Sequence, residues 1–151
     1  MTSTVYILCG IPGSGKSTWC KTHHPELPVV SRDILRAEQG YTTDPDHKKI
    51  CTLDQEIRIT DIEYSLIRKY CEEGTSFIVD DMNITPFWRD HLISTLRSYN
   101  THIIGVNFNT PLEICIERRR GQIDESCMKE IYERARPIFK EDVDEIIKVS
   151  E

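Results

Sequence analysis

Apolar residues along this chain follow two alternating patterns, short continuous runs and longer stretches in which they recur every three or four positions. The continuous runs predict strands buried on both faces, at about residues 4–9, 28–31, 76–79 and 102–108. The spacing of three and four between them predicts helices. Because strands that alternate with helices form βαβ units, we expect an α/β fold built around a parallel sheet.

The longest helical pattern follows the second predicted strand, where apolar side chains from Ile50 to Cys71 form one stripe. Asp44 followed by Pro45 predicts the start of this helix, and Gly74 predicts its end. A last helix is predicted near the end of the chain from apolar residues that share one face, namely Phe139, Val143, Ile146 and Ile147.

A glycine-rich turn at residues 10–17 joins the first predicted strand to a helical pattern. Its three glycines let successive backbone N–H groups converge on one concavity that binds anions. Lys16 adds a positive charge within reach of the β and γ phosphates, and the Ser17 hydroxyl is placed to ligate a bridging Mg²⁺. We therefore predict a P-loop for a nucleoside triphosphate, formed by Gly10, Ile11, Pro12, Gly13, Ser14, Gly15, Lys16, Ser17 and Thr18.

Two acidic residues follow the predicted strand at residues 76–79, at the edge of the sheet where α/β proteins bind ligands. A carboxylate at this position is suited to hold Mg²⁺, directly or through water. Because side chains alternate between the two faces of a strand, one of Asp80 and Asp81 points at the P-loop, and we expect Asp81. The alternative is a solvated turn, which begins with the same residue types.

The segment after the second predicted strand reaches the same edge and carries Arg32, Asp33 and Arg36. Asp33 has the chemistry of a general base for an acceptor hydroxyl, and Arg36, one helical turn away, that of a ligand for an acceptor phosphate. Asp33 equally fits a helix N-cap, and its pairing with Arg36 an exposed i,i+3 ion pair. The spacing alone leaves both interpretations open.

Three consecutive arginines, Arg118, Arg119 and Arg120, end a helical pattern and precede Gly121. Phosphoryl transfer needs cationic groups for the charge that develops on the transferred phosphate. The arrangement predicts a mobile lid that carries arginines over the phosphates. A purely structural role is the alternative, because the helix dipole favours cations at a helix C-terminus.

Length and composition limit the possibilities further. With 151 residues, of which 38% are hydrophobic and 29% charged, the chain fits a single domain over residues 1–151. A net charge of −6 excludes a global attraction for nucleic acid, so a polyanion has to bind a local basic cluster. No apolar run is long enough to cross a membrane and the N-terminus lacks signal-peptide features, which predicts a cytoplasmic protein without a membrane partner.

Four segments make the chain resemble the P-loop 5′-hydroxyl polynucleotide kinases and their small relatives. They are Gly-Ile-Pro-Gly-Ser-Gly-Lys-Ser-Thr-Trp at 10–19, Ser-Arg-Asp-Ile-Leu-Arg at 31–36, Val-Asp-Asp-Met-Asn at 79–83 and Arg-Arg-Arg-Gly at 118–121. The resemblance implies a P-loop NTPase three-layer sandwich, with a four-stranded parallel sheet in the adenylate-kinase-like order and a C-terminal helical lid region. It places the strand of Asp81 next to the P-loop strand.

The resemblance also implies a donor half for the site. ATP is the expected phosphate donor, bound by Lys16 and Ser17. Its Mg²⁺ is expected to be held by Ser17 and by Asp81, which supports the P-loop side. The lid is shorter than that family's pattern after Arg118, and both Arg118 and Arg120 are expected to contact the nucleotide. Arg120 is expected to contact the transferring phosphate.

For the acceptor half, the resemblance implies that Asp33 is the general base and that Arg36 binds an acceptor phosphate. The residues implied to contact the acceptor are Arg32, Asp33, Arg36, Asp81 and Asn83. The leading hypothesis is therefore ATP-dependent phosphorylation of a 5′-hydroxyl end of DNA or RNA.

Two other functions stay open. One is a kinase for a small hydroxyl-bearing metabolite, nucleoside or modified base, in which Arg36 binds another anionic group. The other is an NTPase or nucleotide switch. It is less favoured because the chain has no Asn-Lys-x-Asp guanine-reading motif and no glutamate after Asp80 and Asp81 to activate water.

Overall fold

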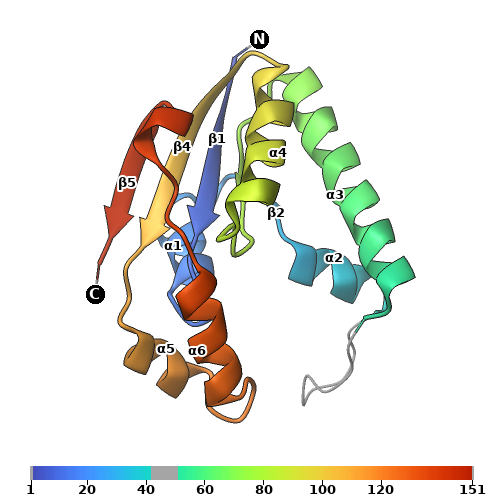
Figure 1. Cartoon of the computed structure of the whole chain (residues 1–151). Coiled ribbons are helices and arrows are strands. Elements are labelled where there is room, and N and C mark those ends of the chain that lie inside the picture. The colour runs from blue at the N-terminus through green and yellow to red at the C-terminus, as the bar shows by residue number, and fades with distance from the viewer. Residues whose placement is uncertain (1, 42–50, 151) are drawn as a thin grey trace.

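The structure is a computed structural model that describes residues 2–41 and 51–150. Parallel strands form one five-stranded sheet in the order β2-β3-β1-β4-β5 (Figure 1). Their bounds are Ser3–Cys9 (β1), Val29–Val30 (β2), Phe77–Val79 (β3), Thr101–Phe108 (β4) and Glu145–Val149 (β5). The predicted α/β fold with a parallel sheet is confirmed, and β3 lies next to the P-loop strand β1 as expected.

Helices cover both faces of this sheet, with α1 on one face and α3 and α4 on the other (Figure 1). The helices are α1 (Lys16–His23), α2 (Arg32–Glu38), α3 (Leu53–Glu73), α4 (Pro86–Arg97), α5 (Leu112–Arg118), α6 (Glu125–Arg134) and the 3₁₀ helix η1 (Lys140–Asp142). In β1, Ile7 joins the core under α3 and α4, whereas Leu8 packs with Trp19 of α1. This alternation produces the predicted three layers. Within the described residues, no helix combines the length and apolar character needed to cross a membrane.

The last stretch of the chain forms a strand, so the helix predicted there is wrong. Residues 145–149 are β5, which pairs in parallel with β4 over Ile104 to Phe108. Ile146, Ile147 and Val149 are β-branched and suit a strand, and the edge of β4 offers them backbone hydrogen bonds. The sheet therefore has five strands instead of the four that the resemblance implies.

Helix α3 ends as predicted, because Gly74 follows it in the left-handed conformation with φ of 69°. Its first turn is closed by a capping box. The Thr52 side chain accepts a hydrogen bond from the backbone N–H of Gln55, and the Gln55 side chain accepts one from that of Thr52. The start predicted at Asp44 and Pro45 lies outside the described residues.

The carboxyl ends of the strands bring the predicted site segments to one edge of the sheet. The P-loop follows β1, α2 follows β2, the Asp80-Asp81 pair follows β3, and the lid helices α5 and α6 follow β4 (Figure 1). Parallel strands share this edge, which is where α/β sheets form ligand crevices. The fold therefore assembles one site from segments far apart in the sequence.

Candidate active site

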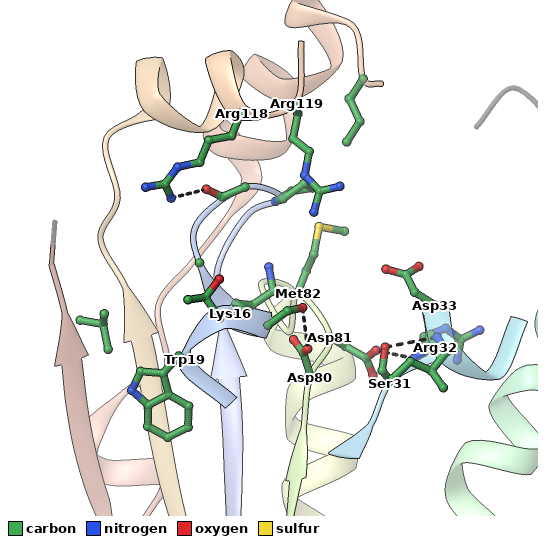
Figure 2. A pocket seen from close by; sticks show the side chains of 18 of the residues that line it. Lys16, Trp19, Ser31, Arg32, Asp33, Asp80, Asp81, Met82, Arg118 and Arg119 are labelled. Carbon is green, nitrogen blue, oxygen red and sulfur yellow. Dashed lines mark hydrogen bonds between the residues drawn. The ribbon is translucent and has the colours of Figure 1, made fainter. Parts of the chain in front are cut away.

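A cavity of about 1010 Å³ opens at the carboxyl edge of the sheet, between the P-loop, α2, the loop after β3 and the lid (Figure 2). Its volume is at the upper end of the range that small-molecule sites occupy in proteins. The charged residues that line it are Lys16, Arg32, Asp33, Arg36, Asp80, Asp81, Arg118 and Arg119. Most of the charged residues predicted from the sequence therefore meet in one place.

The P-loop has the backbone geometry that its glycines predict. Gly13 and Gly15 have φ of 83° and 98°, a region that other residues rarely adopt. A Cβ on Gly13 would lie 2.9 Å from the Cys115 carbonyl oxygen, and one on Gly10 would lie 2.5 Å from Ser14 Oγ. Gly10 and Gly13 therefore leave no room for a side chain, and a larger residue at either position would disturb the turn.

Lys16 folds back onto the P-loop, where its Nζ donates to the carbonyl oxygens of Gly10 at 2.8 Å and Ile11 at 3.0 Å. Burial lowers the pKa of Lys16, and the negative charge of Asp80 opposes that shift. A charged ammonium that is partly shielded from water attracts an anion strongly. The phosphates of a nucleotide are the anions for which the P-loop amides are also arranged.

Asp80, rather than Asp81, is the carboxylate that faces the P-loop, which corrects the sequence prediction. The Ser17 hydroxyl donates to Asp80 Oδ2 at 3.1 Å, whereas Asp81 Oδ1 accepts from the Arg32 backbone N–H at 2.8 Å. Burial raises the pKa of Asp80, while Lys16 and the Ser17 hydrogen bond lower it. Ser17 and Asp80 offer hard oxygen ligands side by side, which is the ligand chemistry that Mg²⁺ prefers.

Asp81 is half-buried and lies against the buried Glu63 of α3. Burial, and after it the neighbouring Asp81 carboxylate, raise the pKa of the Glu63 carboxyl to about 9. Arg32 lies 3.9 Å from Glu63, and its backbone N–H also binds Asp81. The raised pKa of Glu63 favours its protonated, neutral form beside Asp81. Asp81 therefore anchors α2 to α3 in this structure instead of facing Ser17.

Asp33 projects from the first turn of α2 with its side chain 94% exposed. The N-cap of this helix is Ser31, whose Oγ accepts from the backbone N–H of Ile34, so the N-cap interpretation of Asp33 is wrong. The i,i+3 ion pair is present, because Arg36 donates to Asp33 Oδ1 at 2.8 Å. Asp33 lines the cavity, and its role as general base stays a prediction.

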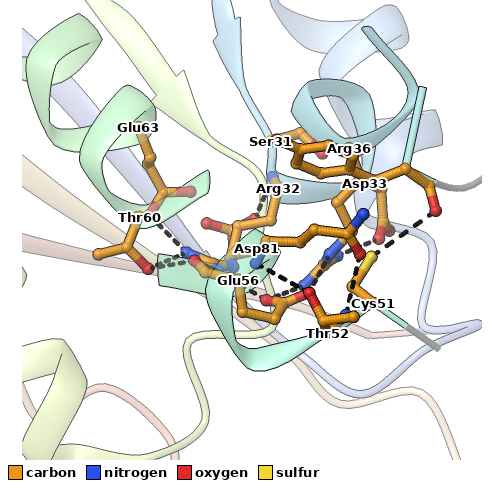
Figure 3. A network of polar contacts seen from close by, with 12 residues as sticks. Ser31, Arg32, Asp33, Arg36, Cys51, Thr52, Glu56, Thr60, Glu63 and Asp81 are labelled. Carbon is orange, nitrogen blue, oxygen red and sulfur yellow. Dashed lines mark hydrogen bonds and ion pairs between the residues drawn. The ribbon is translucent and has the colours of Figure 1, made fainter. Parts of the chain in front are cut away.

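Glu56 of α3 binds both arginines of the acceptor side (Figure 3). Its carboxylate accepts from Arg36 Nε at 2.8 Å and Nη2 at 3.0 Å, and from Arg32 Nη2 at 2.7 Å. These hydrogen bonds, that from Arg36 first, lower the pKa of Glu56 to about 2. Glu56 thus offsets the positive charge of Arg32 and Arg36, which the sequence analysis expected to contact the acceptor.

Neither glutamate partner was evident from motifs, but both lie on one stripe of α3. Glu56, Thr60 and Glu63 recur at spacings of four and three, in phase with the buried Ile67. Acidic residues in a stripe that faces the core indicate ion pairs with side chains of another element. This pattern is the sequence signal that could have pointed to Glu56 and Glu63. The side chains that they meet come from α2 and become visible only in the fold.

The lid presents Arg119 to the cavity, whereas Arg120 lies outside it here, and the expected contact of Arg120 with the phosphate stays a prediction. Arg119 extends into the space above Lys16 and lines the cavity (Figure 2). Arg120 bonds the Glu117 carboxylate at 2.8 and 3.0 Å, and it is absent from the cavity lining. Helix α5 ends at Arg118, and the turn to Gly121 directs the two following side chains differently. Arg118 itself donates to the Gly13 carbonyl at 2.9 Å.

Asn83 supports the loop after β3 and does not line the cavity, unlike the acceptor contact that the resemblance implies. Its Nδ2 donates to the carbonyl oxygens of Leu8 at 2.7 Å and Asp81 at 3.3 Å. The residue also has a positive φ of 51°, which asparagine tolerates better than most side chains. Asn83 thus ties the loop that carries Asp80 to the P-loop strand.

Comparison with known proteins identifies similar sequences and folds. A family model described as an AAA domain matches residues 5–136. The chain is 29% identical over 133 residues to an L-seryl-tRNA(Sec) kinase of Methanococcus maripaludis, a match that covers 85% of this chain and 51%, about half, of that protein. It is 32% identical over 150 residues to an adenylate kinase of Methanosarcina barkeri, covering 93% of this chain and 69% of that protein.

A similar fold is found in two solved structures of the Pnkp1/Rnl/Hen1 RNA repair complex. One matches with a TM-score of 0.67 and 25% identity, over 77% of this chain and 39% of that chain. The other matches with a TM-score of 0.75 and 22% identity, over 87% of this chain and 43% of that chain. Similarity at these levels of identity supports the P-loop kinase fold and leaves the acceptor undetermined.

Proposed function

The chain belongs to the AAA domain family and has a P-loop kinase fold, and from this premise we propose that it transfers the γ-phosphate of ATP to the 5′-hydroxyl end of DNA or RNA. One observation carries the proposal. A single cavity joins a donor side, formed by Lys16, Ser17 and Asp80, to an exposed acceptor-side carboxylate, Asp33. Phosphoryl transfer requires these two halves to face one another.

On the donor side, the P-loop amides and Lys16 bind the phosphates of ATP. Lys16 exchanges its two carbonyl partners for the β and γ phosphate oxygens, a stronger, charge-assisted interaction. Ser17 and Asp80 would hold Mg²⁺, which supplies neutralisation of phosphate charge when bound. Arg119 faces the same space and stabilises negative charge that develops on the transferred group.

On the acceptor side, Asp33 takes the proton from the attacking hydroxyl. The hydroxyl oxygen then forms a bond to the γ-phosphorus, while the bond from that phosphorus to the β–γ bridging oxygen breaks and ADP leaves with the electron pair. Arg36 holds Asp33 by a 2.8 Å hydrogen bond, which orients the carboxylate. A high exposed fraction lets Asp33 reach a large acceptor.

Support for a nucleic acid acceptor comes from relatives. The L-seryl-tRNA(Sec) kinase is named for an RNA-linked acceptor, and the fold also recurs in an RNA repair complex. The cavity opens at the surface of the chain, so a polymer end can enter without the whole polymer being enclosed. Within the described residues 2–41 and 51–150, Arg36 has N–H groups beyond those that bind Glu56 and Asp33, and these can contact a phosphate.

A small hydroxyl-bearing acceptor is the second candidate, and the Glu56 contacts favour it. Glu56 offsets positive charge on Arg32 and Arg36, and the chain as a whole carries a net charge of −6. Both features disfavour a polyanion. The adenylate kinase relative is named for a small nucleotide.

An acceptor panel separates these functions. The protein is incubated with ATP labelled at the γ-phosphate and either a 5′-hydroxyl RNA or DNA oligonucleotide, a nucleoside, or a small polyol. Lys16→Ala protein, which loses donor binding, is the blank for contaminating kinases. Label on the oligonucleotide supports the proposal. Label on small products alone supports the second candidate, and acceptor-independent ATP hydrolysis identifies an NTPase instead.

We expect Arg119→Ala to lower kcat for transfer by about 100-fold, the effect of removing one donor that stabilises transition-state charge. Arg120→Ala is the matched control on the neighbouring residue and is expected to keep kcat within about twofold, because Arg120 pairs with Glu117 outside the cavity. Steady-state kinetics at saturating ATP measure both. A larger loss in Arg120→Ala would show that lid closure exchanges the two arginines.

A further inference from the structure

Two side chains beyond the P-loop bind its backbone from the lid side. The Thr110 hydroxyl, just after β4, donates to the Ser14 carbonyl oxygen at 2.8 Å. Arg118, at the end of α5, donates to the carbonyl oxygen of the preceding residue, Gly13, at 2.9 Å. These contacts hold two successive peptide groups of the loop from the start and the end of the same helix.

The orientation of a carbonyl decides where the next amide points. The C=O and N–H of one peptide group point in opposite directions, because the group is planar and trans. Thr110 holds the Ser14 carbonyl in the protein interior, so the N–H of Gly15 points the opposite way. Gly15 lines the cavity whereas Ser14 is buried beneath it, which agrees with that direction.

Helix α5 also packs directly against the loop. A Cβ on Gly13 would meet the Cys115 carbonyl oxygen at 2.9 Å and the Cys115 Cα at 3.2 Å. Cys115 joins a small core with Ile11 and Met128 of α6. The first lid helix is therefore a wall of the donor site, and Arg119 extends into the cavity from its end.

We propose that Thr110 and Arg118 are positioning residues for the donor site, which fix the Ser14 and Gly13 carbonyls so that the N–H of Gly15 faces the phosphates. This inference rests on the proposed binding of ATP at the P-loop. It assigns Arg118 to the backbone of the loop and leaves the phosphate contact from the lid to Arg119. A preorganised set of amides binds an anion without reorganising first.

Isothermal titration of ATP, and of inorganic tripolyphosphate, into Thr110→Val tests the inference. The valine retains the shape of threonine but loses the hydroxyl, and we expect both ligands to bind about 3- to 10-fold more weakly, as for one lost hydrogen bond. Thr110→Ser keeps the hydroxyl and is expected to bind within about twofold of the parent. Arg118→Met, at an exposed position, is expected to weaken the binding of both ligands by a factor similar to that of Thr110→Val.

Thr101→Val is the matched control. The Thr101 hydroxyl donates to the Leu96 carbonyl at 2.8 Å, the same length as the Thr110 contact, at the opposite end of β4. Thr101→Val and Thr110→Val are both expected to lower the thermal midpoint, but Thr101→Val should leave the affinity for both ligands unchanged. Unchanged affinity in both Thr110→Val and Arg118→Met, or equal losses in Thr110→Ser and Thr110→Val, would overturn the positioning role alone. A parent protein that binds no ATP would overturn the proposed function as well.

Discussion

Asp33→Asn is expected to lower the rate of phosphoryl transfer by about 10²- to 10⁴-fold, the usual contribution of a general base. The asparagine keeps the size of the side chain but cannot accept the hydroxyl proton. Because the Asp33 side chain is 94% exposed, the change should leave the thermal midpoint nearly unaltered. ATP affinity should also stay within about twofold, since Asp33 lies on the acceptor side of the cavity.

Single-turnover transfer with saturating ATP measures the chemical step, and titration of ATP measures binding separately. Asp90→Asn, on the exposed side of α4, is the matched control for loss of one surface carboxylate and is expected to transfer at the parent rate. Transfer by Asp33→Asn at near the parent rate would remove Asp33 from the mechanism. The i,i+3 ion pair with Arg36 would then be its whole role.

Asp80→Asn is expected to lower transfer by about 10³-fold and to raise the Mg²⁺ concentration needed for half-maximal rate. The reason is its contact with Ser17 at 3.1 Å, which places a carboxylate where the metal of a P-loop site is held. An asparagine at this position is a weaker metal ligand and carries no charge. Rates measured over a range of Mg²⁺ concentrations separate a metal defect from a loss of folded protein.

Asp81→Asn is the comparison that distinguishes the two neighbouring carboxylates. Asp81 binds the Arg32 backbone and lies against Glu63, so its loss should lower the thermal midpoint while the Mg²⁺ dependence stays that of the parent. If Asp81→Asn shifts the Mg²⁺ dependence and Asp80→Asn does not, the metal role belongs to Asp81, as the sequence pattern predicts.

Local sequence was sufficient for features that depend on a few adjacent residues. The P-loop could be predicted because glycine spacing dictates its backbone, and the positive φ angles of Gly13 and Gly15 agree. The end of α3 at Gly74 follows from the same conformational preference. The exposed pairing of Asp33 with Arg36 follows from their helical spacing.

Features that depend on a distant partner could not be predicted in this way. The residues of β5 satisfy both helical and strand patterns, and the free edge of β4 decides between them. Asp80 and Asp81 are equivalent in the sequence, but the position of Ser17 selects one and that of Arg32 the other. The choice between Arg119 and Arg120 depends on how the chain turns after α5.

By itself, therefore, the sequence determined the parallel α/β fold, the anion-binding loop and the identity of the segments that meet at the carboxyl edge of the sheet. Those properties arise from periodicity and from local backbone preferences. Only the tertiary structure decided which carboxylate faces Ser17, which lid arginine enters the cavity, and that Glu56 binds Arg32 and Arg36. Each of these depends on side chains from different elements, whose directions are set when the elements pack together.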